Sequence, residues 1–481
     1  MVSMRFLDKL FSTVRNTLPQ SVFFKNISLL LSGTIGSQIL LVFASPILTR
    51  VYSPEAFGNL AVFISIVVVT SMVATMRYEL AIPLPKNTKI AHYLVALSIG
   101  LSLVISFLIG ILVFVYEDYF FAKIGMTGLQ DYYLLIPLGV LFFSLYNTFL
   151  QLAIRQKKFA KIAKAKIAQV ITTLLVQLLF FRFGVFPLLL GHVAGIALGS
   201  YRLSIKRVFT LKIFNFQKIK LIAVSFNRFP KFSMPAGFLR VLGVELPVII
   251  LTAFYSPAAA GLYALANRVL NVPVSAIGNA VSQVFITSAV TSGRDGSLGK
   301  LVSQVHSKMT LIGMPLALVL VFIGPEIFHL VFGEAWRKAG SFAQWMAPWL
   351  YLVFVSAPLT TLTAVLGKQK QGLIFNGVLF FLRLLSLYAG VEFNDLYLTV
   401  TLYCIVNILW RLVFSLWLSC ISGNGALNIL RDHAKAFLLS TLFLVPLIFD
   451  YYKYGNSLGL GLMLSVLVIC GYYFNLLRNS P

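Results

Sequence analysis

The sequence predicts an all-α polytopic membrane protein with about 14 transmembrane helices, in two parallel repeats of six helices followed by two C-terminal helices. Three observations predict this fold class: the composition, a series of long apolar runs, and a short phrase that occurs twice. Of the 481 residues, 59% are hydrophobic and 11% are charged, and the mean hydropathy is +0.90. These charged side chains are too few to cover the surface of a soluble protein of this size, so we expect the chain to lie in a bilayer.

The apolar runs have the length of membrane-spanning helices. A helix needs about 20 mostly apolar residues to cross a bilayer, and about 14 such runs are separated by short polar gaps. They lie at residues 28–47, 59–76, 92–115, 132–154, 167–182, 185–201, 232–253, 259–289, 309–332, 341–365, 372–390, 396–419, 436–449 and 457–475. The runs are continuously apolar, whereas barrel strands alternate over about ten residues, so helices are predicted. The run at 259–289 exceeds one span, which predicts a tilt or an extension beyond the lipid.

The repeated phrase indicates an internal duplication. "YSPEAFGNLA" begins at Tyr52 and "YSPAAAGLYA" begins at Tyr255, and six of ten positions match at an offset of 203 residues. The same offset places the first apolar run on the seventh and the second on the eighth. An even number of helices returns the chain to its starting side, so the two halves are expected to be parallel. In each copy Ser and Pro can cap the next helix, and Gly58 and Gly261 permit close helix approach.

The basic residues orient the predicted bundle. Alternate loops hold roughly 28 Lys and Arg on one side and roughly 6 on the other, so both termini are expected in the cytoplasm. The expected parts are a leader at 1–27, a first lobe at 28–201, a basic cytoplasmic linker at 202–231, a second lobe at 232–421, and two further helices with a tail at 422–481. Positive charge is spread over the leader, so no cleavable signal peptide is expected. The leader is predicted either as an amphipathic helix on the membrane surface or as a disordered segment.

Several classes of function are disfavoured. The net charge of +25 comes from basic residues that alternate with the loops rather than cluster with aromatics in one soluble domain, which argues against nucleic acid as a partner. The nearest match to a phosphate-binding loop, "GRDGSLGKL" at Gly293, has the wrong glycine spacing and lacks Ser or Thr after the lysine. The five histidines and three cysteines are scattered and are interpreted as packing residues. We therefore expect no catalytic residues, no metal site and no cofactor, and we do not expect an enzyme.

Buried positive charge is the main functional signal. Arginines within the apolar spans each cost about 2.5–3.5 kcal/mol if they face lipid, so we expect them to face water, partners or substrate. They are Arg240, Arg268, Arg383 and Arg411. Because a guanidinium matches a phosphate in shape and charge, these residues predict a cavity for an anionic cargo such as a diphosphate head group. The alternative is that these arginines snorkel or bind helix-end carbonyls, and for Arg383 and Arg411 both interpretations stay open. Amide side chains complete the predicted substrate-binding set: Gln38, Gln151, Asn271 and Asn279.

Glu245 is the carboxylate placed most clearly at the depth of these arginines. It lies five residues after Arg240, about 140° around the helix, so we expect it to meet another span. It also precedes Pro247, which frees a backbone carbonyl one turn earlier. A carboxylate beside a broken helix can bind H⁺ or Na⁺ and couple transport to an ion gradient. A structural counter-ion is the alternative interpretation.

Two stretches carry a resemblance to a known family. "SGTIGSQILLVFASPILTRVYSPEAFG" from Ser32 and "RYELAIPLPK" from Arg77 resemble the start of Wzx-type polysaccharide flippases. These belong to the MOP superfamily, together with the multidrug and toxic compound extrusion (MATE) transporters and the lipid II flippases. The resemblance implies two six-helix lobes with two further helices and a cationic central cavity. It has no strict signature residues to carry over.

The resemblance also implies a function. Such a flippase moves an undecaprenyl-diphosphate-linked oligosaccharide across the bacterial inner membrane during synthesis of lipopolysaccharide O-antigen or a related surface polysaccharide, by alternating access and without bond cleavage. A polysaccharide polymerase and a chain-length regulator are expected as partners. A multidrug exporter should carry deep acidic residues in its first half, and none is present there. A lipid II flippase differs only in its cargo, and a membrane glycosyltransferase would need a larger loop or paired carboxylates.

Overall fold

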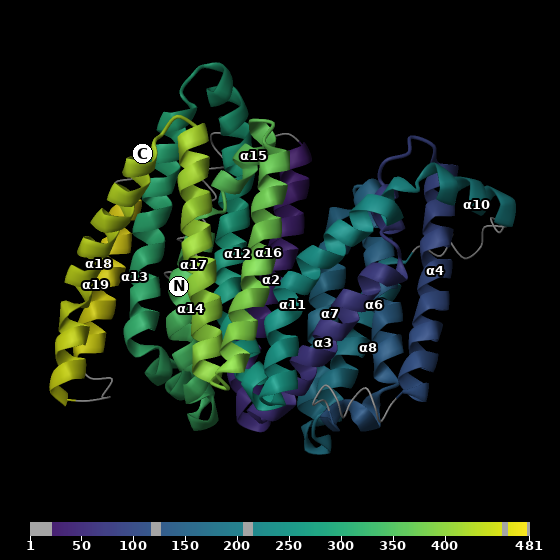
Figure 1. The fold of residues 1–481 in the computed structure, drawn as a ribbon, viewed down its shortest axis with the longest axis horizontal. Helices are drawn as coiled ribbons and strands as arrows, with labels where there is room; N and C mark the ends of the chain where they lie inside the picture. Colours follow the sequence, from purple (N-terminus) through teal and green to yellow (C-terminus); the bar gives the residue numbers. More distant parts are fainter. Residues whose placement is uncertain (1–21, 117–126, 205–214, 455–459, 479–481) are drawn as a thin grey trace. The chain divides into compact units, whose positions relative to one another are not determined.

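The computed structural model describes residues 22–116, 127–204, 215–454 and 460–478, and over these ranges every regular element is a helix (Figure 1). The described chain forms two compact units. We call Val22–Leu265 the first unit and the chain from Ala266 onward the second unit. The boundary falls inside one long helix, and the leader predicted at 1–27 lies largely outside the described residues.

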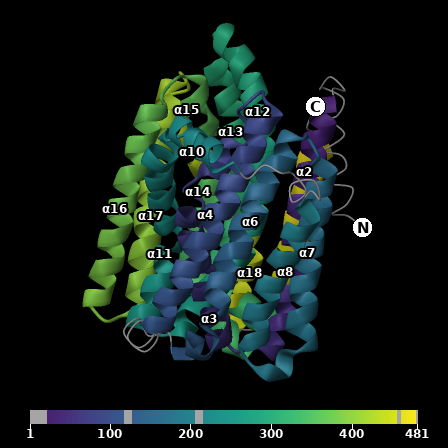
Figure 2. The same cartoon turned by 90° about the vertical axis from the view of Figure 1, so that its right-hand side faces the viewer.

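The first unit is built from eight α-helices and the start of a ninth among its described residues. These are α2 (Val22–Val51), α3 (Pro54–Ala74), α4 (Thr88–Val115), α6 (Leu135–Arg155), α7 (Phe159–Leu179), α8 (Phe186–Leu203), α10 (Phe216–Ser225), α11 (Met234–Phe254) and the beginning of α12 (Pro257–Arg294). Short 3₁₀ or π turns join them: η1 (Tyr78–Ala81), η2 (Thr127–Tyr132), η3 (Phe181–Phe183) and η4 (Phe229–Ser233). Figure 2 shows α4, α6, α7 and α8 side by side, and α6 contacts each of the other three.

The second unit contains the rest of α12 and the C-terminal helices. These are α13 (Leu298–Phe332), η5 (Glu334–Trp336), α14 (Arg337–Ser356), η6 (Leu359–Thr361), α15 (Leu362–Val365), α16 (Gln369–Glu392), α17 (Leu396–Ile421), α18 (Ala426–Tyr454) and α19 (Leu460–Arg478). One apolar core joins α13, α14, α18 and α19, and includes Met309, Leu352, Ala436 and Ile469. The last two helices therefore pack onto the helices before them.

The predicted apolar runs all fall on helices, but the predicted count is not confirmed. Among the described residues, 11 helices are long and apolar enough to cross a membrane, or 12 if the pair Glu334–Ser356 and Leu359–Val365, bent by 53°, forms one span. One of the other two runs coincides with α8, which does not reach this standard, and the other lies on α19, an apolar helix of 19 residues. The long run at 259–289 is a single 38-residue helix, α12, with Pro273 inside it.

The two copies of the repeated phrase adopt the same local structure. The Ser53 hydroxyl accepts from the backbone N–H of Ala56 at 3.2 Å, and the Ser256 hydroxyl accepts from that of Ala259 at 3.2 Å. Pro follows Ser in each copy and occupies the first turn of its helix, where its missing N–H costs nothing. The sequence match therefore corresponds to one helix start, built twice.

The two helix starts also lie against each other within the first unit. A Cβ atom added to Gly58 would overlap the carbonyl oxygen of Pro257, and one added to Gly261 would overlap the carbonyl oxygen of Pro54. The contact is reciprocal, because each glycine accepts the backbone of the other copy. Only glycine permits this approach, as the sequence predicts.

Candidate functional site

The predicted site residues are divided between the two units. Gln38, Gln151, Arg240 and Glu245 belong to the first unit, and Arg268, Asn271, Asn279, Arg383 and Arg411 belong to the second. Arg240, Asn271 and Asn279 are exposed, and the other six are partly buried. Their joint role as the lining of one cavity stays a prediction.

Glu245 on α11 meets α3, a different span, rather than its own neighbour Arg240. Its Oε2 atom lies 2.7 Å from the hydroxyl of Ser65, which is fully buried. The same hydroxyl lies 3.0 Å from the carbonyl oxygen of Ala61. Ser65 is the donor in both contacts, so its one proton is directed to Glu245 Oε2, to the Ala61 carbonyl, or is shared between them. The contact joins α3 to α11.

An ion pair lies in the turn and η1 that follow α3, beside α11, and residue patterns alone did not select it. Arg77 directly follows the turn after α3, with a left-handed backbone (φ 62°), and its Nη1 lies 3.5 Å from Glu79 Oε1. The two side chains are 13% and 5% exposed. A Cβ atom on Gly237 of α11 would come within 2.6 Å of Arg77 Nη2, so the guanidinium lies directly on the α11 backbone. Both residues lie in the stretch "RYELAIPLPK", on which the family resemblance rests. The resemblance assigned no role to either of them.

Two predicted arginines lie on adjacent helices of the second unit. Arg383 on α16 donates from Nε and Nη2 to Asn407 Oδ1 on α17, at 2.9 and 2.6 Å. Asn407 is buried and is itself held by a 2.7 Å hydrogen bond from its Nδ2 to the Tyr403 carbonyl. The Arg383 guanidinium also lies 5.7 Å from the centre of the Tyr403 ring. Asn407 is neutral, so this contact positions the guanidinium without cancelling its charge.

Arg411 adds a second positive charge on α17. Its guanidinium lies 6.0 Å from the centre of the Phe414 ring, and its charge and that of Arg383 repel each other. The ion pairs seen among the described residues involve Arg77, His306, His329 and Arg337, and none includes Arg411. Together, Arg383 and Arg411 form what we call the α16–α17 arginine pair. It offers two guanidinium groups to an anion.

Arg155 shows the other fate of an arginine at a helix end. Its guanidinium donates to backbone carbonyls of the loop after η1: Ile82 at 3.4 Å, Pro83 at 3.3 Å, Lys86 at 3.2 Å, and Pro85. These carbonyls satisfy the side chain, so Arg155 has a structural role.

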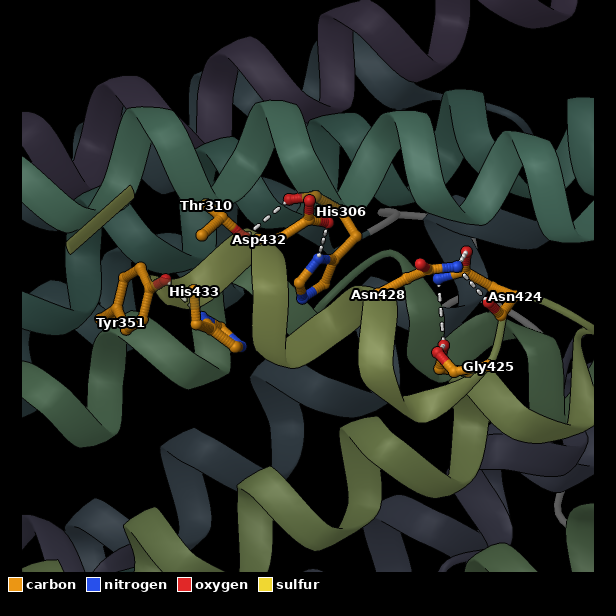
Figure 3. Close-up of polar contacts among 9 residues, drawn as sticks. His306, Thr310, Tyr351, Asn424, Gly425, Asn428, Asp432 and His433 are labelled. Carbon is orange, nitrogen blue, oxygen red and sulfur yellow. Dashed lines mark hydrogen bonds and ion pairs between the residues drawn. The ribbon is translucent and has the colours of Figure 1, made fainter. Parts of the chain in front are cut away.

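The histidines are not all separate packing residues. His306 and His433 meet in the second unit with Tyr351 and Asp432, as Figure 3 shows. No group of three or more potential metal ligands occurs among the described residues.

Comparison with known proteins places these features in context. The model of a protein family described as "Polysaccharide biosynthesis protein" matches residues 47–341. The chain is 22% identical to the teichuronic acid biosynthesis protein TuaB of Bacillus subtilis (strain 168) over 53% of this chain and 54% of TuaB. It is 23% identical to the succinoglycan biosynthesis transport protein ExoT of Rhizobium meliloti (strain 1021) over 78% of this chain and 75% of ExoT. The match to TuaB thus spans about half the length of that relative.

Solved structures share the fold. The lipid II flippase MurJ in an inward closed conformation matches with a TM-score of 0.74 at 14% identity, covering 94% of this chain and 100% of that one. A MATE family transporter of the MOP superfamily, in an inward-facing conformation, matches with a TM-score of 0.62 at 17% identity, covering 80% of this chain and 94% of that one. The chain therefore shares the fold of these multi-span membrane transporters, and the predicted all-α, MATE-like fold class is confirmed.

Proposed function

Because the chain belongs to the family of polysaccharide biosynthesis proteins, we propose that it is a flippase for an undecaprenyl-diphosphate-linked oligosaccharide in the bacterial inner membrane. The head group crosses from the cytoplasmic to the outer leaflet while the polyprenyl tail stays in lipid. No bond is broken. The sugar-bearing lipid supplies material for a surface polysaccharide.

The α16–α17 arginine pair is the observation that carries this proposal. The two relatives act in polysaccharide biosynthesis by their names, and any lipid carrier of a saccharide that uses a diphosphate brings two adjacent negative groups. Guanidinium groups bind phosphate oxygens through two parallel hydrogen bonds. Arg383 is oriented by the neutral amide of Asn407, and Arg411 lies beside the Phe414 ring; neither of these two contacts cancels a guanidinium charge.

The duplication supports alternating access. Parallel repeats let a site between two lobes face either side of a membrane in turn. On the orientation proposed here, with both termini cytoplasmic, the Tyr-Ser-Pro turns face outward. The Gly58 and Gly261 contact then closes the outer side, and it has to separate before the cargo can leave.

Glu245 is the proposed coupling residue. A protonated Glu245 satisfies Ser65 and Ala61 together, whereas an ionised Glu245 competes with the Ala61 carbonyl for the Ser65 proton. Proton binding therefore changes the contact between α3 and α11. Such a change can bias the two access states.

Reconstitution tests the cargo. The protein is placed in liposomes with a fluorescent undecaprenyl-diphosphate oligosaccharide, and translocation is followed by an impermeant quencher. Arg411→Gln should weaken binding of the cargo about 10- to 100-fold, because a charge-assisted hydrogen bond contributes about 1.5–3 kcal/mol. Arg294→Gln is the matched control, since Arg294 is exposed at the end of α12 and the substitution removes the same charge.

The same assay separates the alternatives. Lipid II is offered as a competitor, because the fold resembles that of MurJ and the two cargoes share a diphosphate. Preferential transport of lipid II would replace the proposed cargo with that one. The proposal would be overturned if Arg411→Gln and Arg294→Gln weakened cargo binding equally. It would also be overturned if the protein transported cationic drugs but neither lipid.

A further inference from the structure

Three helices of the second unit bring four titratable side chains into one buried cluster. His306 lies on α13, Tyr351 on α14, and Asp432 and His433 on α18. His306 Nδ1 lies 2.9 Å from Asp432 Oδ2, and the Tyr351 hydroxyl lies 2.7 Å from His433 Nδ1. The His306 side chain is fully buried and that of Asp432 is 17% exposed. We call these four residues the histidine cluster (Figure 3).

The two imidazole rings are neighbours with a free nitrogen each. Their centres are 5.0 Å apart and their planes are nearly perpendicular, at 87°. Each Nδ1 is engaged, by Asp432 or by Tyr351. Each Nε2 is buried and has no hydrogen-bond partner among the described residues. A buried polar atom without a partner is costly, so two of them side by side require an explanation.

The explanation begins with which ring nitrogens of the cluster carry hydrogen. A carboxylate only accepts, so the Nδ1 of His306 carries hydrogen and donates to Asp432, which leaves Nε2 of the neutral ring as a bare acceptor. If the Tyr351 hydroxyl donates to His433 Nδ1, the neutral His433 carries its hydrogen on Nε2 and is a donor. The Nε2 of His306 then lacks a donor partner, and the Nε2 of His433 lacks an acceptor partner. The two Nε2 atoms thus hold one hydrogen between them before a proton is added, and an added proton is accommodated when His433 carries hydrogen on Nδ1 and donates to the Tyr351 oxygen.

The surroundings leave the cluster with one negative charge. Asp432 is its acidic member, and Thr310 on α13 adds only a hydroxyl, which donates to the His306 carbonyl at 2.8 Å. The other charged residues near it on α13 and α18 are exposed: Lys308, Arg431 and Lys435. The hydrophobic core that includes Tyr351 also contains residues of α12 and α17: Val274, Ile277, Val281, Ile408 and Leu412. Two other tyrosines belong to the same core, Tyr451 and Tyr473, and the Tyr473 hydroxyl donates to the Ile312 carbonyl. A net charge in such surroundings is unfavourable, and one added proton removes it.

We propose that the histidine cluster is a proton-binding site, in which His306 and His433 share one proton and Asp432 is the counter-ion. Binding changes the cluster from a net charge of −1 to neutral, and the buried pair cannot take up a second proton without a net positive charge. The site is chemically separate from Glu245, which lies in the first unit. It does not depend on the identity of the cargo.

The site also lies where α18 is attached to the second unit. α18 packs along α13, and its Asp432 and His433 reach His306 and Tyr351 on α13 and α14. Loss of the proton leaves an uncompensated carboxylate in that contact. The protonation state therefore sets how firmly α18 is held.

Histidine NMR of the full chain tests the proposal without any cargo. The protein is labelled with ¹⁵N-histidine, placed in lipid nanodiscs and titrated between about pH 5 and about pH 8, the range in which imidazoles change charge. We expect the signals of His306 and His433 to move together and to report one proton between them. His329, which is half exposed and lies 3.0 Å from Glu334, is the internal control, and its signal should not change in variants of the cluster.

Variants assign the signals and guard against misfolding. His306→Gln should change the His433 signal, and Asp432→Asn, which keeps the shape of the side chain, should abolish proton uptake by the pair in this range. Tyr351→Phe should alter the tautomer of His433 while the chain remains folded. Independent uptake of two protons, no uptake across the range, or unchanged behaviour in Asp432→Asn would overturn the proposal.

Discussion

Replacing Gly58 by alanine adds one methyl group where α3 meets the start of α12. The added Cβ would overlap the Pro257 carbonyl, which belongs to helix backbone and cannot rotate away as a flexible side chain can. Overpacking of this kind costs about 1–3 kcal/mol. Gly58 lies inside a helix, so the gain in helix propensity from alanine offsets up to about 1 kcal/mol of that cost. Because the overlap is with backbone, the cost lies in the upper part of that range, about 2–3 kcal/mol, and we expect Gly58→Ala to lower the free energy of unfolding by about 1–2 kcal/mol.

Thermal unfolding in detergent measures this change, and a matched variant isolates its cause. For a unit of this size, about 1 kcal/mol corresponds to a shift of about 2–4 °C in Tm, so Gly58→Ala should lower Tm by about 2–8 °C. Gly100 lies inside α4 of the same unit with open space around its Cβ direction. Gly100→Ala should leave Tm unchanged or raise it, because only the propensity gain remains. Equal Tm values for the two variants would refute the close contact.

Three further predictions concern other contacts of the first unit. Glu245→Gln should leave transport present but insensitive to ΔpH, since the amide cannot exchange the proton shared with Ser65; unchanged ΔpH dependence in liposomes would remove the coupling role. Arg155→Gln should lower Tm, because the carbonyls of Ile82, Pro83 and Lys86 lose their donor, while cargo binding persists; a binding defect at normal Tm would contradict its structural role. Burial raises the pKa of Tyr52, whose hydroxyl donates to the Gln177 carbonyl at 2.6 Å, to about 12 from 10.0. The contribution of neutral Tyr52 to stability is present below about pH 10 and is lost as pH rises through about 12. In Tyr52→Phe the free energy of unfolding should therefore fall less steeply with pH in that window, and the same pH dependence as in the unsubstituted protein would count against the prediction.

The helices were predictable because their signal is local. A run of about 20 apolar residues has to satisfy its own backbone in lipid, and it does so as a helix whatever its neighbours are. The number of spans was less predictable, because α8, with 18 residues, is close to the limit of length at which a helix crosses alone. Such helices depend on tertiary packing, which composition does not record.

The candidate site was only partly predictable because its contacts join distant positions. Helical geometry directed Glu245 away from Arg240, but nothing local selected Ser65, which is 180 residues away. Arg383 and Asn407 each stood out as polar residues in apolar runs, yet their hydrogen bond depends on how α16 packs on α17. His306 and Asp432, 126 residues apart, gave no sequence signal at all. Residue types indicate which groups need partners, and the packing decides which partners they find.

The repeated phrase is the exception, because duplication carries long-range information in a local pattern. If two halves descend from one sequence and are related by an axis, then equivalent residues near that axis meet each other. A glycine that admits the backbone of its counterpart must then occur in both copies, since substitution in either one is enough to force the helices apart. Gly58 faces Pro257 and Gly261 faces Pro54, so the contact obeys this reciprocity. The Ser-Pro cap and the glycine are therefore among the six shared positions, together with the tyrosine and two alanines, whereas the other four positions differ.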